Sequence, residues 1–174
     1  MSALTVTSAG TWTLDPVHST IGFELPYLAG TFRGQFTDVG AQLTDESLTG
    51  SARVGSVDVK DENLAAHLQS PEFFDAERHP ELTFASRELV REGNELEARG
   101  EITIKGVTQP VELAGTITDP IVDPYGRERI GVALSGTVDR TAFGIDWNAP
   151  LPSGEPALAN EVKLVADLYF VKAA

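Results

Sequence analysis

The chain has 174 residues, no cysteine, and 13 Lys and Arg against 26 Asp and Glu, which gives a net charge of −13. Without cysteine it can form neither a disulfide framework nor a thiolate metal or redox site. The acidic balance argues against nucleic acid as a partner and against docking on anionic lipid heads, because both need Lys and Arg. The length suits one domain, and we expect residues 1–10 to form an N-terminal tail and residues 11–174 a single domain.

The first residues lack both the basic and the apolar segment of a secretory signal peptide. No apolar run approaches the ~18 residues of a membrane-spanning helix. We therefore expect a cytoplasmic protein without a membrane span.

Alternation of apolar and polar residues, the pattern of half-buried strands, dominates the chain. In chain order it predicts strands at residues 11–15, 19–25, 31–43, 51–59, 81–90, 96–104, 111–117, 130–138 and 162–170. Turn sequences such as Gly106–Pro110 and Asp123–Gly126 separate these runs.

One segment between the predicted strands breaks the alternation. Asp61 is a candidate N-cap for a helix over residues 61–69, with Leu64 and Leu68 one helical turn apart. Ser70 followed by Pro71 is typical of a cap with proline at the first helical position. The sequence therefore predicts one or two short helices packed on an all-β body.

Small residues recur near the middle of the inward-facing rows, namely Ala98, Gly100, Gly115, Gly136 and Ala166. Eight or nine antiparallel strands in one domain form a sandwich or a closed barrel, and these small residues favour the barrel. Glycine packs nothing and weakens a strand, so on an inner face it either permits sharp coiling or leaves room inside. An eight-stranded barrel can be filled by side chains or can hold one small ligand.

Candidate catalytic residues are few. Asp15, His18 and Ser19 have the residue types of a hydrolase triad. On a strand, however, His18 and Ser19 point to opposite faces, and no Gly-x-Ser-x-Gly elbow is present. We expect His18 to make structural hydrogen bonds, and we expect the charged residues at 123–129 to form a solvated turn.

The other polar candidates also have a structural interpretation. His67 and His79, with Asp75 between them, fit no known metal-ligand spacing. Arg140, beside Asp139 at a strand end, is expected to brace a loop through hydrogen bonds. We therefore expect no catalytic residue, no metal site and no cofactor.

A further pattern runs in order along the chain, through Trp12–Phe23, Arg33–Phe36, His67–Asp75, Pro80–Phe84, Gly100–Val111 and Arg140–Ile145. Together these stretches resemble the YceI-like family of polyisoprenoid-binding, lipocalin-like proteins, many of which are secreted to the periplasm. The resemblance implies an extended, lipocalin-like, antiparallel eight-stranded β-barrel with a short helical insert. It also implies a long apolar tunnel that holds an isoprenoid quinone, a polyisoprenoid or a similar amphiphilic lipid. Pro26-Tyr27 and Leu64-Ala65 depart from the family pattern by replacing polar residues near the expected mouth.

Inward apolar side chains are the candidate binding residues, because a prenyl chain offers no charge to pair and gains affinity from buried area. From the alternation they are Phe23, Leu25, Phe32, Phe36, Ile102, Leu113, Ile117, Val132, Leu134, Leu164 and Leu168, with Phe73 and Phe74 as candidate gate residues. We expect a protein that sequesters or carries an isoprenoid quinone, a polyisoprenoid or a fatty amide. If the chain forms a homo-oligomer, a two-fold homodimer is the expected assembly.

Two alternatives stay open at this level. One is an enzyme acting on a ligand held in the barrel, with His18 and Arg140 as its best candidate catalytic residues. The other is a structural barrel with a solid core, no cavity and a protein partner that covers an exposed apolar patch.

Overall fold

The computed structural model describes residues 10–149 and 151–173. The expected N-terminal tail over residues 1–10 lies outside the described residues except for Gly10. The strands are β1 Trp12–Leu14, β2 Thr20–Tyr27, β3 Gly30–Phe36, β4 Val39–Leu43, β5 Leu48–Arg53, β6 Val57–Asp58, β7 Glu81–Glu92, β8 Glu95–Ile104, β9 Val107–Ile117, β10 Ile121–Val122, β11 Glu128–Asp139 and β12 Glu161–Lys172. The helices are α1 Glu62–Leu68 and the 3₁₀ turns η1 Val54–Ser56 and η2 Arg140–Phe143.

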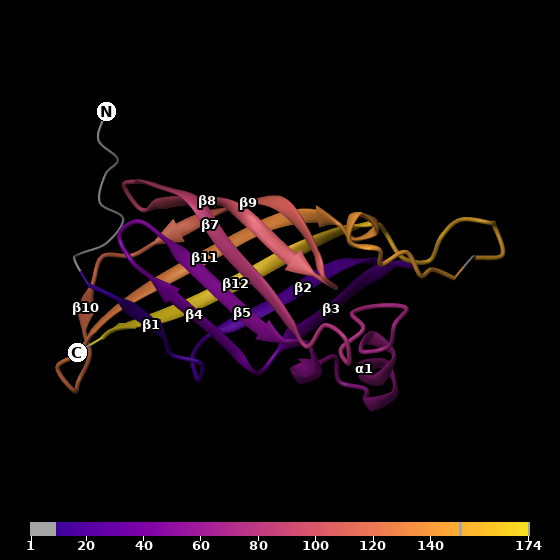
Figure 1. The fold of residues 1–174 in the computed structure, drawn as a ribbon, viewed down its shortest axis with the longest axis horizontal. Helices are drawn as coiled ribbons and strands as arrows, with labels where there is room; N and C mark the ends of the chain where they lie inside the picture. Colours follow the sequence, from indigo (N-terminus) through magenta and orange to yellow (C-terminus); the bar gives the residue numbers. More distant parts are fainter. Residues whose placement is uncertain (1–9, 150, 174) are drawn as a thin grey trace.

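The strands form one antiparallel sheet in the order β10-β11-β9-β8-β7-β5-β4-β1-β12-β2-β3-β6, and an additional β11–β12 pairing closes it. β1 and β2 lie one after the other along the same edge of β12, opposite residues 170–172 and 163–167. Two more barrel strands are interrupted in the same way: one consists of β3 and β4, and the other of β5 and β6. Counted in this way, the fold is a closed antiparallel eight-stranded barrel, which confirms the expected architecture (Figure 1).

The prediction of single strands at residues 31–43 and 51–59 is wrong. The chain bends at Thr37, whose N–H donates to the carbonyl of Ser56 (3.2 Å), and the N–H of Arg53 donates to the carbonyl of Asp38 (2.9 Å). The β3–β4 and β5–β6 segments therefore bend beside each other. Before the bend at Thr37, β3 pairs with β2 and β6; after it, β4 pairs with β1 and β5.

The insert between β6 and β7 contains one α-helix. The Asp61 carboxylate accepts from the N–H of Leu64 (2.9 Å), so the expected N-cap is present. Of the one or two short helices predicted here, one is present. After Ser70 the chain forms turns, because the N–H groups of Phe73 and Asp75 both donate to the Ser70 carbonyl and Asp75 has a left-handed φ of 52°. Among the described residues, no helix is long and apolar enough to cross a membrane.

The two ends of the barrel differ. The end that contains β1 and the start of β11 is filled by side chains no more than 1% exposed, namely Trp12, Leu43, Leu96, Ile117, Ile130 and Phe170. Trp12 lies opposite Leu43, and Ile130 lies opposite Phe170. Figure 1 shows α1 at the opposite end of the barrel from β1 and β10. The packed end closes the barrel, so any ligand space must lie toward α1.

Candidate functional site

A cavity of about 320 Å³ lies inside the barrel toward α1. Its lining is mostly apolar and comes from strands around the barrel, from α1 and from the loops that follow η2. Small-molecule pockets typically measure ~300–1,000 Å³, so this volume suits one slender molecule or the end of a longer one.

Eleven of the thirteen candidate binding residues line this cavity. They are Phe23, Leu25, Phe32, Phe36, Phe73, Phe74, Ile102, Leu113, Leu134, Leu164 and Leu168. Ile117 and Val132 are outside the lining, which corrects the sequence prediction. They lie opposite each other on β9 and β11 and are 1% and 3% exposed, so they belong to the packed end.

The cavity reaches the surface beside α1. Tyr27, at the end of β2, and Leu64, on α1, both line the cavity and are 43% and 36% exposed. These are the two segments in which the sequence departs from the family pattern. The rim at this opening is therefore formed by an aromatic and an aliphatic side chain.

Four phenylalanines form a cluster on one side of the lining. The ring of Phe23 packs against those of Phe32, Phe36 and Phe74, with centroid distances of 6.0, 5.8 and 6.0 Å. Phe74 also meets Phe36 edge to face at 5.9 Å. Such pairs stabilise the packing beyond area burial, so Phe74 fixes the insert against β2 and β3.

A second aromatic cluster joins the insert to the loop before β12. The Trp147 ring lies 5.0 Å from the His67 ring and 5.4 Å from the Phe73 ring, measured between centroids. His67 Nε2 is 2.7 Å from a carboxylate oxygen of Glu72, which orients the imidazole. Trp147 has no signal in the sequence pattern, because strand alternation carries no information about an irregular loop.

The inward glycines do not enlarge the cavity. A Cβ at Gly100 would lie 2.1 Å from the carbonyl oxygen of Ala85, and one at Gly136 would lie 2.4 Å from that of Glu112. At both positions the backbone of the neighbouring strand takes the place of a side chain. Of the two explanations left open by the sequence, these positions therefore agree with sharp strand coiling and close approach.

Arg140 is the one buried cation among the described residues, with 5% of its surface exposed, and it lines the cavity. Its Nε donates to the carbonyl of Ala159, and its Nη1 donates to those of Ile145 and Trp147, each at 2.9 Å. Burial lowers the pKa of the guanidinium from its usual value, and the charges of Asp146 and Asp139 offset part of this change. Arg140 thus braces the loop before β12, as the sequence predicts.

The Asp15, His18 and Ser19 group is not arranged as a triad. His18 Nδ1 is 2.8 Å from the Asp15 carboxylate, but Ser19 Oγ donates to the Asp15 carbonyl (2.7 Å) and accepts from the N–H of Tyr169 (2.9 Å). None of these residues lines the cavity. The three side chains therefore hold the junction between β1 and β2 to β12.

The residues at 123–129 form more than a solvated turn. Arg129 donates to the carboxylates of Asp15 and Asp123, both at 2.8 Å, and the Asp123 side chain is only 8% exposed. Hydrogen bonds from Arg129 and from backbone N–H groups lower the pKa of Asp123 to about 2. Hydrogen bonds with His18 and Arg129 lower the pKa of Asp15 to about 2. The network links the start of β11 to the β1–β2 junction.

Within the described part of the chain, no group of three or more His, Asp or Glu side chains could hold a metal ion. His67 bonds with Glu72 rather than with His79 or Asp75. The chemistry that this site offers is therefore apolar contact, with Arg140 as its charged group.

Comparison with known proteins agrees with this geometry. Residues 12–170 match the YceI-like domain family. A UPF0312 protein of Staphylococcus epidermidis is 32% identical over 168 residues, which cover 90% of this chain and 94% of that protein. The crystal structure of BcnA from Burkholderia cenocepacia has a TM-score of 0.74 at 19% identity and covers 90% of this chain and 98% of that one. A polyisoprenoid binding domain from Saccharophagus degradans has a TM-score of 0.67 at 10% identity, over 93% of this chain and 98% of that one. At these identities, the two solved structures show a shared fold.

Proposed function

This chain belongs to the YceI-like family, and we propose that it binds a long apolar ligand in the hollow half of the barrel and sequesters or carries it. The ligand class that we propose is an isoprenoid quinone, a polyisoprenoid or a fatty amide. The observation that carries this proposal is the apolar cavity of about 320 Å³, which opens at Tyr27 and Leu64. The name of the Saccharophagus degradans structural neighbour, a polyisoprenoid binding domain, supports the same class.

The energetics of such binding suit the lining. Each apolar Å² removed from water contributes roughly 25 cal/mol, so a chain can bind tightly without a directed bond along its length. The aromatic rings of Phe23, Phe36 and Phe74 already hold one another in place, so a ligand does not have to order them. No catalytic group is needed for this role.

The direction of entry follows from the packed end. Trp12 and Phe170 are fully buried there, so the chain of a ligand enters past Tyr27 and Leu64 and runs toward Leu113 and Leu168. A ligand longer than the cavity leaves its remaining length at the opening or displaces lining side chains.

The test is organic extraction of the purified protein followed by mass spectrometry, together with titration of isoprenoid quinones and fatty amides into protein freed of lipid. We expect a co-purified apolar compound, or saturable uptake with one molecule per chain. The proposal is contradicted if extraction yields no bound species and neither class of compound binds on titration.

A further inference from the structure

Arg140 has hydrogen-bond donors that the chain does not use. A guanidinium carries five N–H groups, one on Nε and two on each Nη. Three hydrogen bonds to backbone carbonyls employ Nε and Nη1, as described above. Nη2 is buried and has no partner among the described residues. Both of its N–H groups therefore lack an acceptor within the described residues, although buried donors in proteins are nearly always paired.

The positive charge of Arg140 also lacks a directly bonded carboxylate within the described ranges. The nearest acid in the sequence, Asp139, accepts instead from the N–H (2.9 Å) and the hydroxyl (2.6 Å) of Thr141. Asp146 lies on the exposed side of the same loop. Leaving a buried charged donor unpaired costs several kcal/mol in general, which makes this atom an attachment point for an acceptor.

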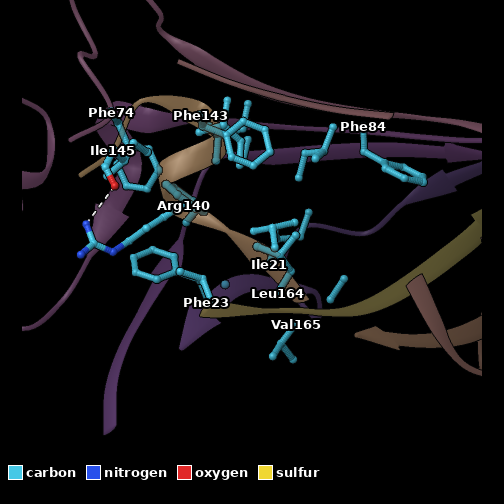
Figure 2. A pocket seen from close by; sticks show the side chains of 18 of the residues that line it. Ile21, Phe23, Phe74, Phe84, Arg140, Phe143, Ile145, Leu164 and Val165 are labelled. Atoms are coloured by element: carbon cyan, nitrogen blue, oxygen red, sulfur yellow. Dashed lines mark hydrogen bonds between the residues drawn. The ribbon is translucent and has the colours of Figure 1, made fainter. Parts of the chain in front are cut away.

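The residue that carries this donor belongs to the cavity lining. Arg140 lines the cavity next to Ile145 and Trp147, to whose carbonyls it is bonded. Figure 2 shows its guanidinium at one end of the labelled lining residues, on the side of Phe23 and Phe74 and away from Phe84. A purely hydrocarbon ligand would leave Nη2 unpaired, whereas an oxygen on the ligand would complete its hydrogen bonds.

We propose that Arg140 Nη2 binds the polar head of the ligand, and that this head carries an oxygen acceptor, with a carboxylate bound more tightly than a neutral carbonyl. This inference rests on the proposed function, because it assumes that an apolar chain occupies the lumen. It adds that the cavity selects an amphiphile by its head. Charge-assisted hydrogen bonds of this kind discriminate by roughly ten- to hundredfold in affinity.

The first test uses the wild-type protein and three probes with the same twelve-carbon chain: dodecanoate, dodecanamide and dodecyltrimethylammonium. Each competes for the site with the neutral fluorescent probe N-phenyl-1-naphthylamine. We expect dodecanoate to bind roughly tenfold or more tightly than dodecyltrimethylammonium, with dodecanamide between them. The net charge of −13 by itself favours the opposite order, because it attracts the cation.

The outcomes of this test separate the two proposals. If dodecyltrimethylammonium binds as tightly as dodecanoate, the role of Arg140 is wrong while apolar binding stands. If none of the three probes displaces N-phenyl-1-naphthylamine, the proposed function itself is contradicted.

A variant comparison assigns the preference to this residue. Arg140→Gln removes the charge, so the ratio of the dodecanoate and dodecyltrimethylammonium affinities should fall at least tenfold. Arg129→Gln is the matched control, because Arg129 is also hydrogen-bonded and partly buried but lies in the Asp15 and Asp123 network outside the cavity lining. It should lower stability and leave the ratio unchanged. An unchanged ratio in folded Arg140→Gln overturns the inference, and if that variant does not fold, the order of the three probes on the wild type decides.

Discussion

Arg129 and Arg140 both donate hydrogen bonds within this barrel, yet their surroundings give them different roles. Arg129 lies between two carboxylates, so its charge is neutralised by the chain itself. Arg140 lines the cavity, donates to three carbonyls, and has an Nη2 without a partner among the described residues. The difference lies in the bonding partners rather than in the residue type, which is why sequence alone does not distinguish them.

The Arg129 network predicts a specific loss of stability in acid. The folded pKa of Asp123 is about 2, below the value of about 3.9 for an unperturbed carboxyl. A depressed pKa contributes stability that is present above pH ~4 and is lost as the pH falls toward 2. Asp123→Asn should therefore be less stable at pH 7, with a shallower decline between pH 5 and 2, as measured by urea unfolding at each pH.

The control for this prediction is Asp45→Asn, which changes an exposed carboxylate in the turn between β4 and β5. It should follow the wild-type profile. A profile of Asp123→Asn that is parallel to wild type across pH 5 to 2 would show that the network does not contribute to acid sensitivity.

Which candidate residues line the cavity could be predicted in part. Alternation places Ile117, Val132 and Leu134 on the inner face, and all three are buried. It does not give their level along the barrel axis, which is set by strand register and shear. Leu134 reaches the cavity and the other two do not. Trp147 and Leu158, which line the cavity from a loop, have no periodic signal at all.

At the scale of elements, alternation predicted the strands but not their interruptions. The interruptions are nevertheless visible in the burial pattern, because the alternation of buried and exposed side chains shifts by one residue at each interruption. Phe36 is buried on β3, whereas Leu43 is buried on β4, seven positions on, which an unbroken strand would place on the opposite face. The short β10 has no alternation to detect, since Ile121 and Val122 are both exposed.

The close approach at Gly100 predicts that even a small side chain is costly there. Gly100 lies opposite Ser86, where the β7–β8 register shifts between Ser86 and Glu88. Because an added Cβ meets the backbone at Ala85, Gly100→Ala should destabilise the protein by about 1–3 kcal/mol, measured by denaturant unfolding. A larger residue such as leucine should prevent folding.

Gly131→Ala is the control for Gly100→Ala, since a Cβ there meets only the Thr118 side chain at 3.6 Å or more. It should cost much less than Gly100→Ala. Equal stability losses in the two variants would mean that the strand coiling does not depend on the missing side chain at Gly100.

At the scale of the whole molecule, one end of the barrel is packed and the other is hollow. The acidic side chains that alternate with the inward apolar residues, such as Glu97, Glu112 and Asp167, are exposed or partly exposed, and the high net charge of the chain favours solubility. The apolar side chains between them form the core and the cavity lining. Alternation in the sequence therefore predicts the apolar interior, whereas the asymmetry between the two ends of the barrel depends on packing.

The central claim is that the hollow half of the barrel is the binding site, and filling it is the most direct test. Ala166 on β12 lines the cavity, whereas Ala133 on the neighbouring β11 is exposed. The measurement is the dissociation constant of N-phenyl-1-naphthylamine, obtained by fluorescence titration of wild type, Ala166→Phe and Ala133→Phe. We predict at least tenfold weaker binding for Ala166→Phe, with a stability loss of about 1–3 kcal/mol, and wild-type binding for Ala133→Phe. Wild-type affinity in a folded Ala166→Phe protein would contradict the account.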